Sequence, residues 1–206
     1  MRVGYDQAAK QYLEARPVDG RDVELLEALH DRMTPHARVL DIGCGAGVPV
    51  SRRLIDLGHE VIGIDFSSAQ LDFAKRHVPR LRVVEADMVG LPFGSERADA
   101  VVCYYAIIHV PRENHSGVFR EFHRVLRPGG WALLCVGSDD NPEDLDAESW
   151  MGTPMYWSHY DAPTTMGLLE EVGFEVVSSW DVPDPMGHGS HRFVLAQSLN
   201  SAVRGR

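Results

Sequence analysis

The glycines of one short segment have a spacing that suits them to hold a ligand. Gly43, Gly45 and Gly47 follow the mostly apolar residues 39–42 at alternate positions. Glycine adopts positive φ angles and has no Cβ, so the main chain of such a loop can approach a ligand closely. A buried strand that turns through glycines into a helix is typical of nucleotide-binding proteins.

Two carboxylates near this loop narrow the choice of ligand. A second apolar segment, residues 61–64, ends on Asp65, whose two oxygens can accept both hydroxyls of a ribose. A dinucleotide fingerprint reads G-x-G-x-x-G and binds a pyrophosphate. Here the third glycine comes one residue early, and Asp41 would repel the phosphates. S-adenosylmethionine suits the loop better, because it carries an ammonium and a sulfonium group and no phosphate.

Further segments along the chain extend this pattern. Residues 39–47, Asp65, 86–88, 91–93, 99–102 and 126–130 resemble the class I S-adenosylmethionine-dependent methyltransferases in order and spacing, over roughly residues 5–197. The resemblance implies a Rossmann-like, doubly wound, seven-stranded α/β sheet, mostly parallel with an antiparallel C-terminal edge pair. It also implies S-adenosyl-L-methionine as cofactor and methyl transfer to an oxygen or nitrogen atom of a small molecule.

The resemblance assigns cofactor-binding roles to the residues of the loop. Gly43, Gly45 and Gly47 are expected to lie against the methionyl group and the ribose. Asp41 is expected to orient the loop and favour the ammonium group, and Asp65 to accept the ribose hydroxyls.

Three more residues are expected around the adenine. By the resemblance, Asp87 hydrogen-bonds the adenine amino group, Met88 supports the ring and Phe66 packs on its other side. The simpler alternative is that Asp65 and Asp87 only cap turns after strands, and that Phe66 and Met88 are ordinary core residues.

Aromatic residues from two other segments are expected to complete the site. Tyr5 and Tyr12 share one face of a predicted helix over residues 5–14. In similar small-molecule methyltransferases a helix with Tyr-Asp-x-x-Ala-x-x-Tyr lies over the cofactor as a lid; a helix docked only for stability is the alternative. Tyr104 ends a predicted strand whose tip faces the ligand crevice, so residues 105–109 are expected beside the transferable methyl group.

Two histidines are candidates for removing a proton from the acceptor. His109 follows the strand that ends at Tyr104, and His159 lies in an aromatic segment. A neutral imidazole can take a proton near neutral pH. Positioning alone can supply roughly 7 to 11 kcal/mol of the barrier, so a mechanism without a base stays open. The histidines show no metal-ligand spacing, and no metal site is expected.

Strand and helix patterns alternate, which indicates a parallel sheet with helices on both faces. Residues 127–130 are a predicted turn, and Ser67 with Gln70 a predicted capping box. The predicted strands are 38–42, 61–64, 82–85, 98–104, 131–136, 174–182 and 192–197, and the predicted helices are 5–14, 22–32, 48–57, 69–77, 113–126 and 162–172.

The size of the chain fits one methyltransferase domain, residues 1–206. Within it we expect four parts: N-terminal lid and cap helices at 1–35, a cofactor-binding core at 36–137, a substrate-covering loop at 138–160, and a C-terminal helix and strand pair at 161–198. The loop is expected to be functional because it is long and rich in apolar residues.

Composition limits the partners. The net charge of −10 argues against a nucleic-acid substrate, which needs a basic surface, and favours a small-molecule acceptor. The three cysteines lie in apolar runs, as in reduced proteins, and no apolar stretch has transmembrane length. We therefore expect a cytoplasmic monomer or homodimer with no membrane partner.

Two rival functions remain at this point. One is a catalytically silent methyltransferase fold that binds cofactor or a protein partner as a regulatory module. The other is an NAD-binding oxidoreductase domain, which the glycine spacing and the lack of room for a catalytic domain disfavour. The identity of the methyl acceptor cannot be read from these residues.

Overall fold

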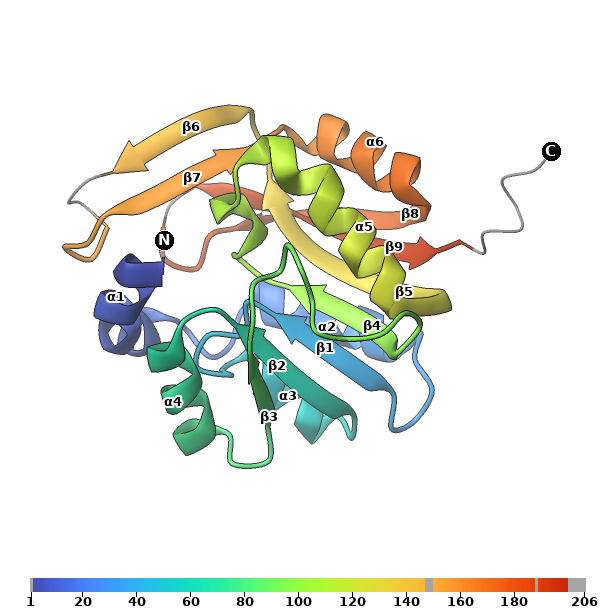
Figure 1. Ribbon diagram of the computed structural model, residues 1–206, viewed down its shortest axis with the longest axis horizontal. Coiled ribbons are helices and arrows are strands. Elements are labelled where there is room, and N and C mark those ends of the chain that lie inside the picture. Colours follow the sequence, from blue (N-terminus) through green and yellow to red (C-terminus); the bar gives the residue numbers. More distant parts are fainter. Residues whose placement is uncertain (1, 147–149, 188, 200–206) are drawn as a thin grey trace.

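The computed structural model describes residues 2–146, 150–187 and 189–199, and a seven-stranded sheet forms its centre (Figure 1). The strand order is β3-β2-β1-β4-β5-β9-β8, and all neighbours are parallel except that β9 is antiparallel to β5 and β8. The predicted Rossmann-like sheet with its antiparallel C-terminal edge pair is confirmed. The strands are β1 (Arg38–Ile42), β2 (Glu60–Asp65), β3 (Arg82–Glu85), β4 (Ala98–Cys103), β5 (Leu126–Gly137), β8 (Phe174–Pro183) and β9 (Ser190–Ser198).

Helices cover both faces of this sheet. One buried apolar cluster includes residues of α2, α3 and α4, and a second includes residues of α5 and α6. Strand β4 supplies both: Ala100 and Val102 belong to the first cluster, and Val101 and Cys103 to the second, as the two-residue period of a strand requires. The helices are α1 (Arg2–Ala15), α2 (Arg21–His30), α3 (Val50–Asp56), α4 (Ser68–His77), α5 (His115–Val125) and α6 (Ala162–Val172), with short 3-10 helices η1 (Ile107–His109) and η2 (Arg112–Asn114).

The strand order places a ligand crevice at the carboxyl ends of β1 and β4. From β1 the chain continues to β2 and β3 on one side, and β4 and β5 lie on the other. Such a reversal leaves a gap between the connecting segments, and open α/β sheets bind ligands there. The glycine loop follows β1 directly, and residues 104–109 follow β4.

The predicted turn at residues 127–130 is wrong in one respect, because these residues lie within strand β5. Ala98 pairs with Leu126, whereas Ala100 pairs with Trp131, so the extra residues of β5 form a bulge. Gly129 takes a φ of 76° inside this bulge, which few other residues adopt. Pairing on both sides of the bulge extends the strand beyond its predicted start.

The predicted loop at 138–160 is also different, because it contains two strands that pair with each other as a β-hairpin. Strands β6 (Asn141–Asp146) and β7 (Met155–His159) pair antiparallel in a separate two-stranded sheet, while residues 147–149 lie outside the described residues. The buried Ser158 hydroxyl joins the strands, since it donates to the Pro142 carbonyl at 2.7 Å. The acidic, turn-forming residues of β6 have low strand propensity, so this strand depends on its partner.

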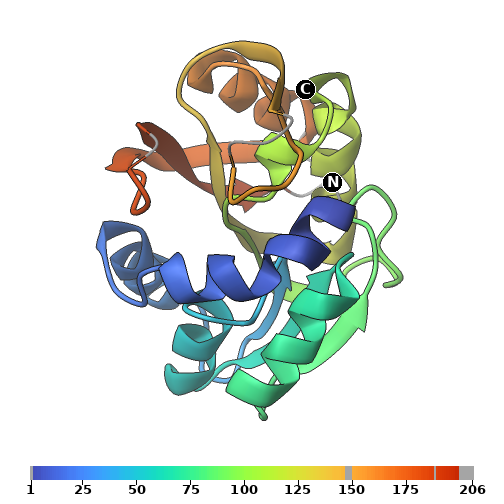
Figure 2. The same ribbon diagram turned by 90° about the vertical axis from the view of Figure 1, so that its left-hand side faces the viewer.

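Helix α1 lies across the crevice between α4 and the β6–β7 hairpin (Figure 2). On the α4 side, the Asp6 carboxylate accepts a hydrogen bond from the Ser67 hydroxyl at 2.5 Å. On the hairpin side, the backbone at Gly4 is so close that an added Cβ would lie 2.5 Å from the Pro154 carbonyl oxygen. Contacts with α4 on one side and with the hairpin on the other therefore keep α1 in place over the crevice.

Candidate active site

Three adjoining cavities open at the carboxyl ends of β1 and β4. The largest, the outer cavity, has a volume of about 430 Å³ and lies between α1, the hairpin and the β8–β9 turn. The loop cavity of about 40 Å³ lies against residues 43–46, and the Asp65 cavity of about 50 Å³ lies between that loop and the end of β2. Tyr12 and Tyr105 line all three cavities, so the cavities lie side by side around these two residues.

The Asp65 cavity brings together residues that are far apart in the sequence. Most of the residues predicted to bind the cofactor meet here, as does the candidate base His109. The lining residues are Tyr5, Tyr12, Gly43, Gly45, Asp65, Phe66, Gln70, Met88, Tyr104, Tyr105, Ala106 and His109.

Asp65 is held in place by backbone groups. Its Oδ2 accepts a hydrogen bond from the Gly45 N–H and its Oδ1 one from the Ser67 N–H, each at 2.9 Å. Burial raises the pKa of this carboxyl, and these hydrogen bonds offset part of the rise. Each oxygen keeps a second lone pair, so the carboxylate can still accept hydroxyl groups from a ligand.

Gln70 is a residue whose role the sequence did not reveal. Its backbone N–H donates to the Ser67 hydroxyl at 3.2 Å, which is the N-cap half of the predicted capping box. Its side chain does not complete the box: it is 1% exposed, and its Oε1 and Nε2 have no partner among the described residues. A buried amide without partners beside Asp65 suits a polar ligand such as a ribose.

The loop cavity has a carboxylate and a guanidinium in its lining. Asp41 is 1% exposed and accepts a hydrogen bond from the Ser51 hydroxyl at 2.5 Å; burial raises its pKa to about 7. Arg16 forms a buried ion pair with Asp22 and lies 5.0 Å from the centre of the Tyr105 ring. This arrangement can complement the ammonium and carboxylate groups of an amino acid, and therefore fits the methionyl end of S-adenosylmethionine.

Two residues of the predicted cofactor site lie apart from these cavities. Gly47 faces the core, where an added Cβ would lie 2.9 Å from a methyl group of Leu81. Asp87 is exposed, and its Oδ1 accepts a hydrogen bond from the Val89 N–H at 3.1 Å. The turn-capping alternative therefore describes the contacts of Asp87, although its neighbour Met88 does line the Asp65 cavity.

His109 connects three elements through its two ring nitrogens. Its Nδ1 lies 2.7 Å from the Tyr156 carbonyl oxygen and must donate to it, so the Nε2 accepts from the Tyr5 hydroxyl at 2.8 Å. Burial lowers the pKa of His109 to about 4 and raises that of Tyr5 well above its usual value. Both groups are therefore neutral at pH 7, and they join α1 to η1 and β7.

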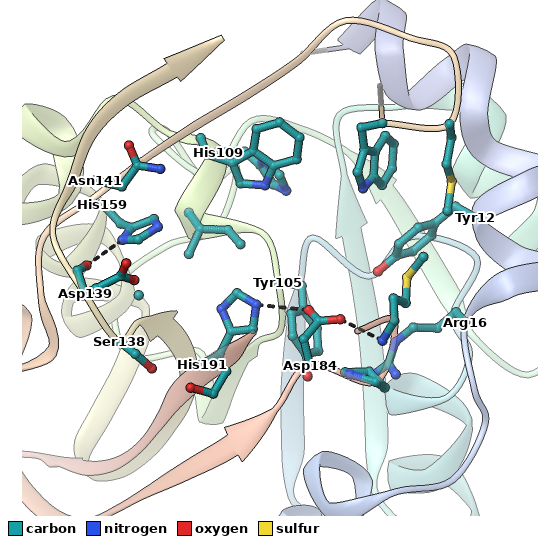
Figure 3. Close-up of a pocket in the computed structure, with 18 of the residues that line it drawn as sticks. Tyr12, Arg16, Tyr105, His109, Ser138, Asp139, Asn141, His159, Asp184 and His191 are labelled. Carbon is teal, nitrogen blue, oxygen red and sulfur yellow. Dashed lines mark hydrogen bonds and ion pairs between the residues drawn. The ribbon is translucent and has the colours of Figure 1, made fainter. Parts of the chain in front are cut away.

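The outer cavity combines aromatic rings with hydrogen-bonding groups (Figure 3). His159, the second candidate base, is one of its polar residues, and its Nδ1 donates to the Asp139 carbonyl at 3.0 Å. The aromatic residues are Tyr5, Tyr12, Tyr105, Trp150 and Trp157, and the polar ones include Arg16, Ser138, Asp139, Asn141, His159, Asp184 and His191.

Backbone strain marks the centre of the site. Tyr105 has a φ of 52°, which is uncommon for a residue with a bulky side chain. Its hydroxyl lies 3.2 Å from the Asp22 carboxylate, and its ring borders every cavity of the site. Strain that is held by surrounding contacts is common at functional sites.

The chain is similar to known proteins in both sequence and fold. Residues 39–130 match a family described as a methyltransferase domain. The 24-methylenesterol C-methyltransferase 2 of Oryza sativa subsp. japonica is 30% identical over 181 residues, which are 80% of this chain and 47% of that protein. The chain thus spans about half the length of this curated relative.

Solved structures share the fold at low sequence identity. A 1,6-didemethyltoxoflavin-N1-methyltransferase of Burkholderia thailandensis, crystallised with 1,6-didemethyltoxoflavin and S-adenosylhomocysteine, superposes with a TM-score of 0.77 at 22% identity, covering 97% of this chain and 87% of that one. A SAM-dependent methyltransferase of Methanosarcina mazei gives 0.74 at 22% identity, covering 84% and 97%. In the described part of the chain, no helix combines the length and apolarity needed to cross a membrane.

Proposed function

We propose that this chain, which belongs to the class I S-adenosylmethionine-dependent methyltransferases, moves a methyl group to an oxygen or nitrogen atom of a small molecule. One observation carries the choice of acceptor. The outer cavity, with its aromatic and polar lining, adjoins the Asp65 cavity, and Tyr5, Tyr12, Tyr105 and His109 line both. An acceptor in the outer cavity would therefore meet the cofactor beside these four side chains.

The cofactor would occupy the two smaller cavities. Asp65 and Gln70 are placed to bind the ribose, and Asp41 and Arg16 to bind the amino-acid end. Phe66 and Met88 border the same space as apolar walls for the adenine, and Asp87, next to Met88, is the expected partner of the adenine amino group. These two cavities are far smaller than a typical ligand site, so α1 must move outward to admit the cofactor.

Chemistry at this site is mainly a matter of position. When bound, S-adenosylmethionine supplies a methyl group that its sulfonium already activates. The chain has to orient the acceptor atom and exclude water, and α1 with the hairpin covers the site for that purpose. If the acceptor must lose a proton, His109 and His159 border the outer cavity as the bases expected from the sequence.

The polar lining disfavours a sterol as acceptor. A sterol would place hydrocarbon against Arg16, Asp139 and Asp184 and remove water from these charged groups without replacing their hydrogen bonds. A small aromatic molecule with hydroxyl or amine groups can satisfy both the rings and the charges of this cavity.

Two measurements test the proposal. Calorimetric titration with S-adenosylhomocysteine should show binding, and Asp65→Ala should weaken it by about 1.5 to 3 kcal/mol because the ribose hydroxyls lose a charged acceptor. Asp72→Ala, on the exposed face of α4, is the matched control and should bind normally.

Release of S-adenosylhomocysteine with a panel of phenols, aromatic amines and heteroaromatic N–H compounds should then identify the acceptor. Binding without turnover on any acceptor would favour the silent regulatory module, and binding of NAD instead would favour the oxidoreductase.

A further inference from the structure

We propose that His191, oriented by Asp184, is the general base that removes the proton from an acceptor O–H or N–H. The inference rests on the proposed methyl transfer and specifies its acceptor side. Neither residue belongs to the cofactor-binding pattern of the sequence, and the strand that carries His191 is the antiparallel β9. Because β9 runs opposite to β5, its first residues lie at the ligand-binding edge of the sheet, where His191 pairs with Gly137.

Asp184 is fixed by the turn between β8 and β9. Its N–H donates to the Gly189 carbonyl at 2.9 Å, and its Oδ1 accepts a hydrogen bond from the Met186 N–H at 2.6 Å. The other carboxylate oxygen, Oδ2, lies 3.0 Å from the Nε2 of His191. A carboxylate held in this way keeps the proton of the neutral imidazole on Nε2.

The second ring nitrogen of His191 is left with a lone pair. Its Nδ1 is buried and has no hydrogen-bond partner among the described residues. Figure 3 shows the ring between Asp184 on one side and the part of the outer cavity near Ser138 and His159 on the other. The ring also contacts Tyr105 edge to face, with centroids 5.1 Å apart, and Tyr105 borders the cavities assigned to the cofactor. An acceptor in the part of the outer cavity near Ser138 and His159 would therefore offer its proton to the Nδ1 of His191.

The two other histidines of the cavity are less well placed to take a proton. Both nitrogens of His109 already have partners, and one of these is the hydroxyl of Tyr5. His159 has an Nδ1 bonded to the backbone carbonyl of Asp139, so it lacks the carboxylate that would stabilise a protonated ring. His191 alone among these three has both a carboxylate partner and a free acceptor nitrogen.

The proposed step is balanced within the site. The acceptor oxygen or nitrogen forms its bond to the methyl carbon, the carbon–sulfur bond breaks, and its electron pair stays on the sulfur. The acceptor proton passes to the Nδ1 of His191, and the resulting imidazolium is paired with the Asp184 carboxylate. After product release the proton leaves to solvent.

Polar and charged groups from several elements lie around the His191–Asp184 pair. Tyr105 contacts the ring from the end of β4, and Arg16 lines the same cavity from the segment after α1. Asp139 and His159 border it from the end of β5 and from β7. Asp184→Asn should lower turnover because it removes the carboxylate that orients the His191 ring.

The first test needs no substrate. In the full-length protein with S-adenosylhomocysteine bound, the ring nitrogens of His191 can be observed by long-range ¹H–¹⁵N NMR after through-bond assignment. The proposal expects a proton on Nε2 and none on Nδ1, and loss of this preference in Asp184→Asn. A proton on Nδ1 in the wild-type protein would overturn the proposal.

The second test compares two probes, 4-methylphenol and 4-nitrophenol, at alkaline pH where only the nitrophenol is ionised. His191→Asn should lower turnover about 100-fold with 4-methylphenol and less than about 3-fold with 4-nitrophenol, which has no proton to give. His77→Asn, on the exposed end of α4, is the control.

An equal loss with both probes would mean a structural role and overturn the proposal, as would no loss with either. If the wild-type protein binds S-adenosylhomocysteine but methylates neither phenol, the proposed function fails for phenols, and the NMR result still decides on the pair.

Discussion

The buried amide of Gln70, which we propose binds the cofactor, should lower the stability of the protein without ligand. In the absence of ligand, its Oε1 and Nε2 lose their hydrogen bonds to water and gain none from the described residues. Such groups cost roughly 1 to 3 kcal/mol each. A bound ribose would restore these hydrogen bonds. The free energy that the unliganded protein loses would then be regained only with a ligand that forms hydrogen bonds, which favours polar ligands over apolar ones.

Replacing Gln70 with methionine should therefore have opposite effects on stability and on binding. Gln70→Met keeps the length of the side chain but removes the unpaired amide. Urea denaturation of the free protein should show a free energy of unfolding higher by about 1 kcal/mol, and calorimetry should show S-adenosylhomocysteine binding about tenfold more weakly. Unchanged affinity would remove Gln70 from the cofactor site.

Thr165 offers a matched control for this substitution. Its hydroxyl in α6 is also buried without a partner in the described part of the chain, but it lines none of the three cavities. Thr165→Val should raise the free energy of unfolding in the same way and leave cofactor affinity unchanged.

At the scale of single residues, the sequence indicated those candidate site residues that come at or directly after the end of a buried strand. Asp65 and Gly43 could be located because each comes at the end of a buried strand. Arg16 and His191 could not, because one lies just beyond a helix end and the other begins an antiparallel strand, and no spacing links either of them to the glycine loop. Only the packed chain brings them to the same cavities.

Among the elements, α1 lies over the cavities that we propose for the cofactor. It contacts α4 through Asp6 and Ser67 and approaches the hairpin closely at Gly4, and none of these contacts involves a strand of the seven-stranded sheet. The predicted lid function remains a proposal, and the close approach of Gly4 to the hairpin provides a direct way to test it.

Gly4→Ala should displace the beginning of α1 from the hairpin. The added Cβ would lie 2.5 Å from the Pro154 carbonyl oxygen and 2.8 Å from the Thr153 hydroxyl, so the helix has to move. We expect faster proteolysis within α1 and weaker binding of S-adenosylhomocysteine, while the core stays folded. Limited proteolysis with and without S-adenosylhomocysteine measures both effects.

Gly117→Ala serves as the control for that experiment. Gly117 lies in α5, and an added Cβ there would meet nothing within 4 Å. The substitution should stabilise the protein by roughly 0.5 to 1 kcal/mol, because alanine favours a helix. If Gly4→Ala showed the same proteolysis rate and affinity as Gly117→Ala, α1 would be no lid.

Among the helices and strands, those of the parallel sheet could be predicted from the sequence, and the hairpin could not. Strands of the parallel sheet each contain a short run of apolar, often β-branched residues, which makes them recognisable in the sequence; β1 and β3 match the predicted ranges. The hairpin could not be predicted, because the residues of β6 are acidic and include Pro142, and their pairing depends on contacts such as that of Ser158. The bulge in β5 was hidden for a related reason, since Pro128 and Gly129 usually mark the end of a strand.

For the molecule as a whole, the site has a measurable effect on stability, because it buries groups with opposite responses to pH. Asp41 in the folded protein keeps its proton up to about pH 7, whereas an exposed aspartate loses it near 3.8. The unfolded chain therefore binds fewer protons between these values, and Asp41 makes the protein less stable as pH rises through that window. The full effect is about 4 kcal/mol at most.

His109 acts in the opposite direction over nearly the same range. Burial lowers its pKa from 6.5 to about 4, so the unfolded chain binds more protons between these values and the protein loses stability as pH falls. The full effect is about 3 kcal/mol. Between about pH 4 and 6.5 the two contributions largely cancel in the wild-type protein.

Removing either group should reveal the slope of the other. In Asp41→Asn, which keeps an acceptor for the Ser51 hydroxyl, the free energy of unfolding should rise relative to wild type as pH increases from about 4 to 7. In His109→Gln it should fall relative to wild type as pH increases from about 4 to 6.5, whatever constant offset the lost contacts with Tyr5 and Tyr156 add. Urea denaturation of the three proteins without cofactor, at several pH values across this range, measures both differences. Parallel curves for the two variants would show that neither group titrates as its burial requires, whereas diverging curves would establish that the cofactor cavities contain a protonated carboxyl and a neutral imidazole near pH 6.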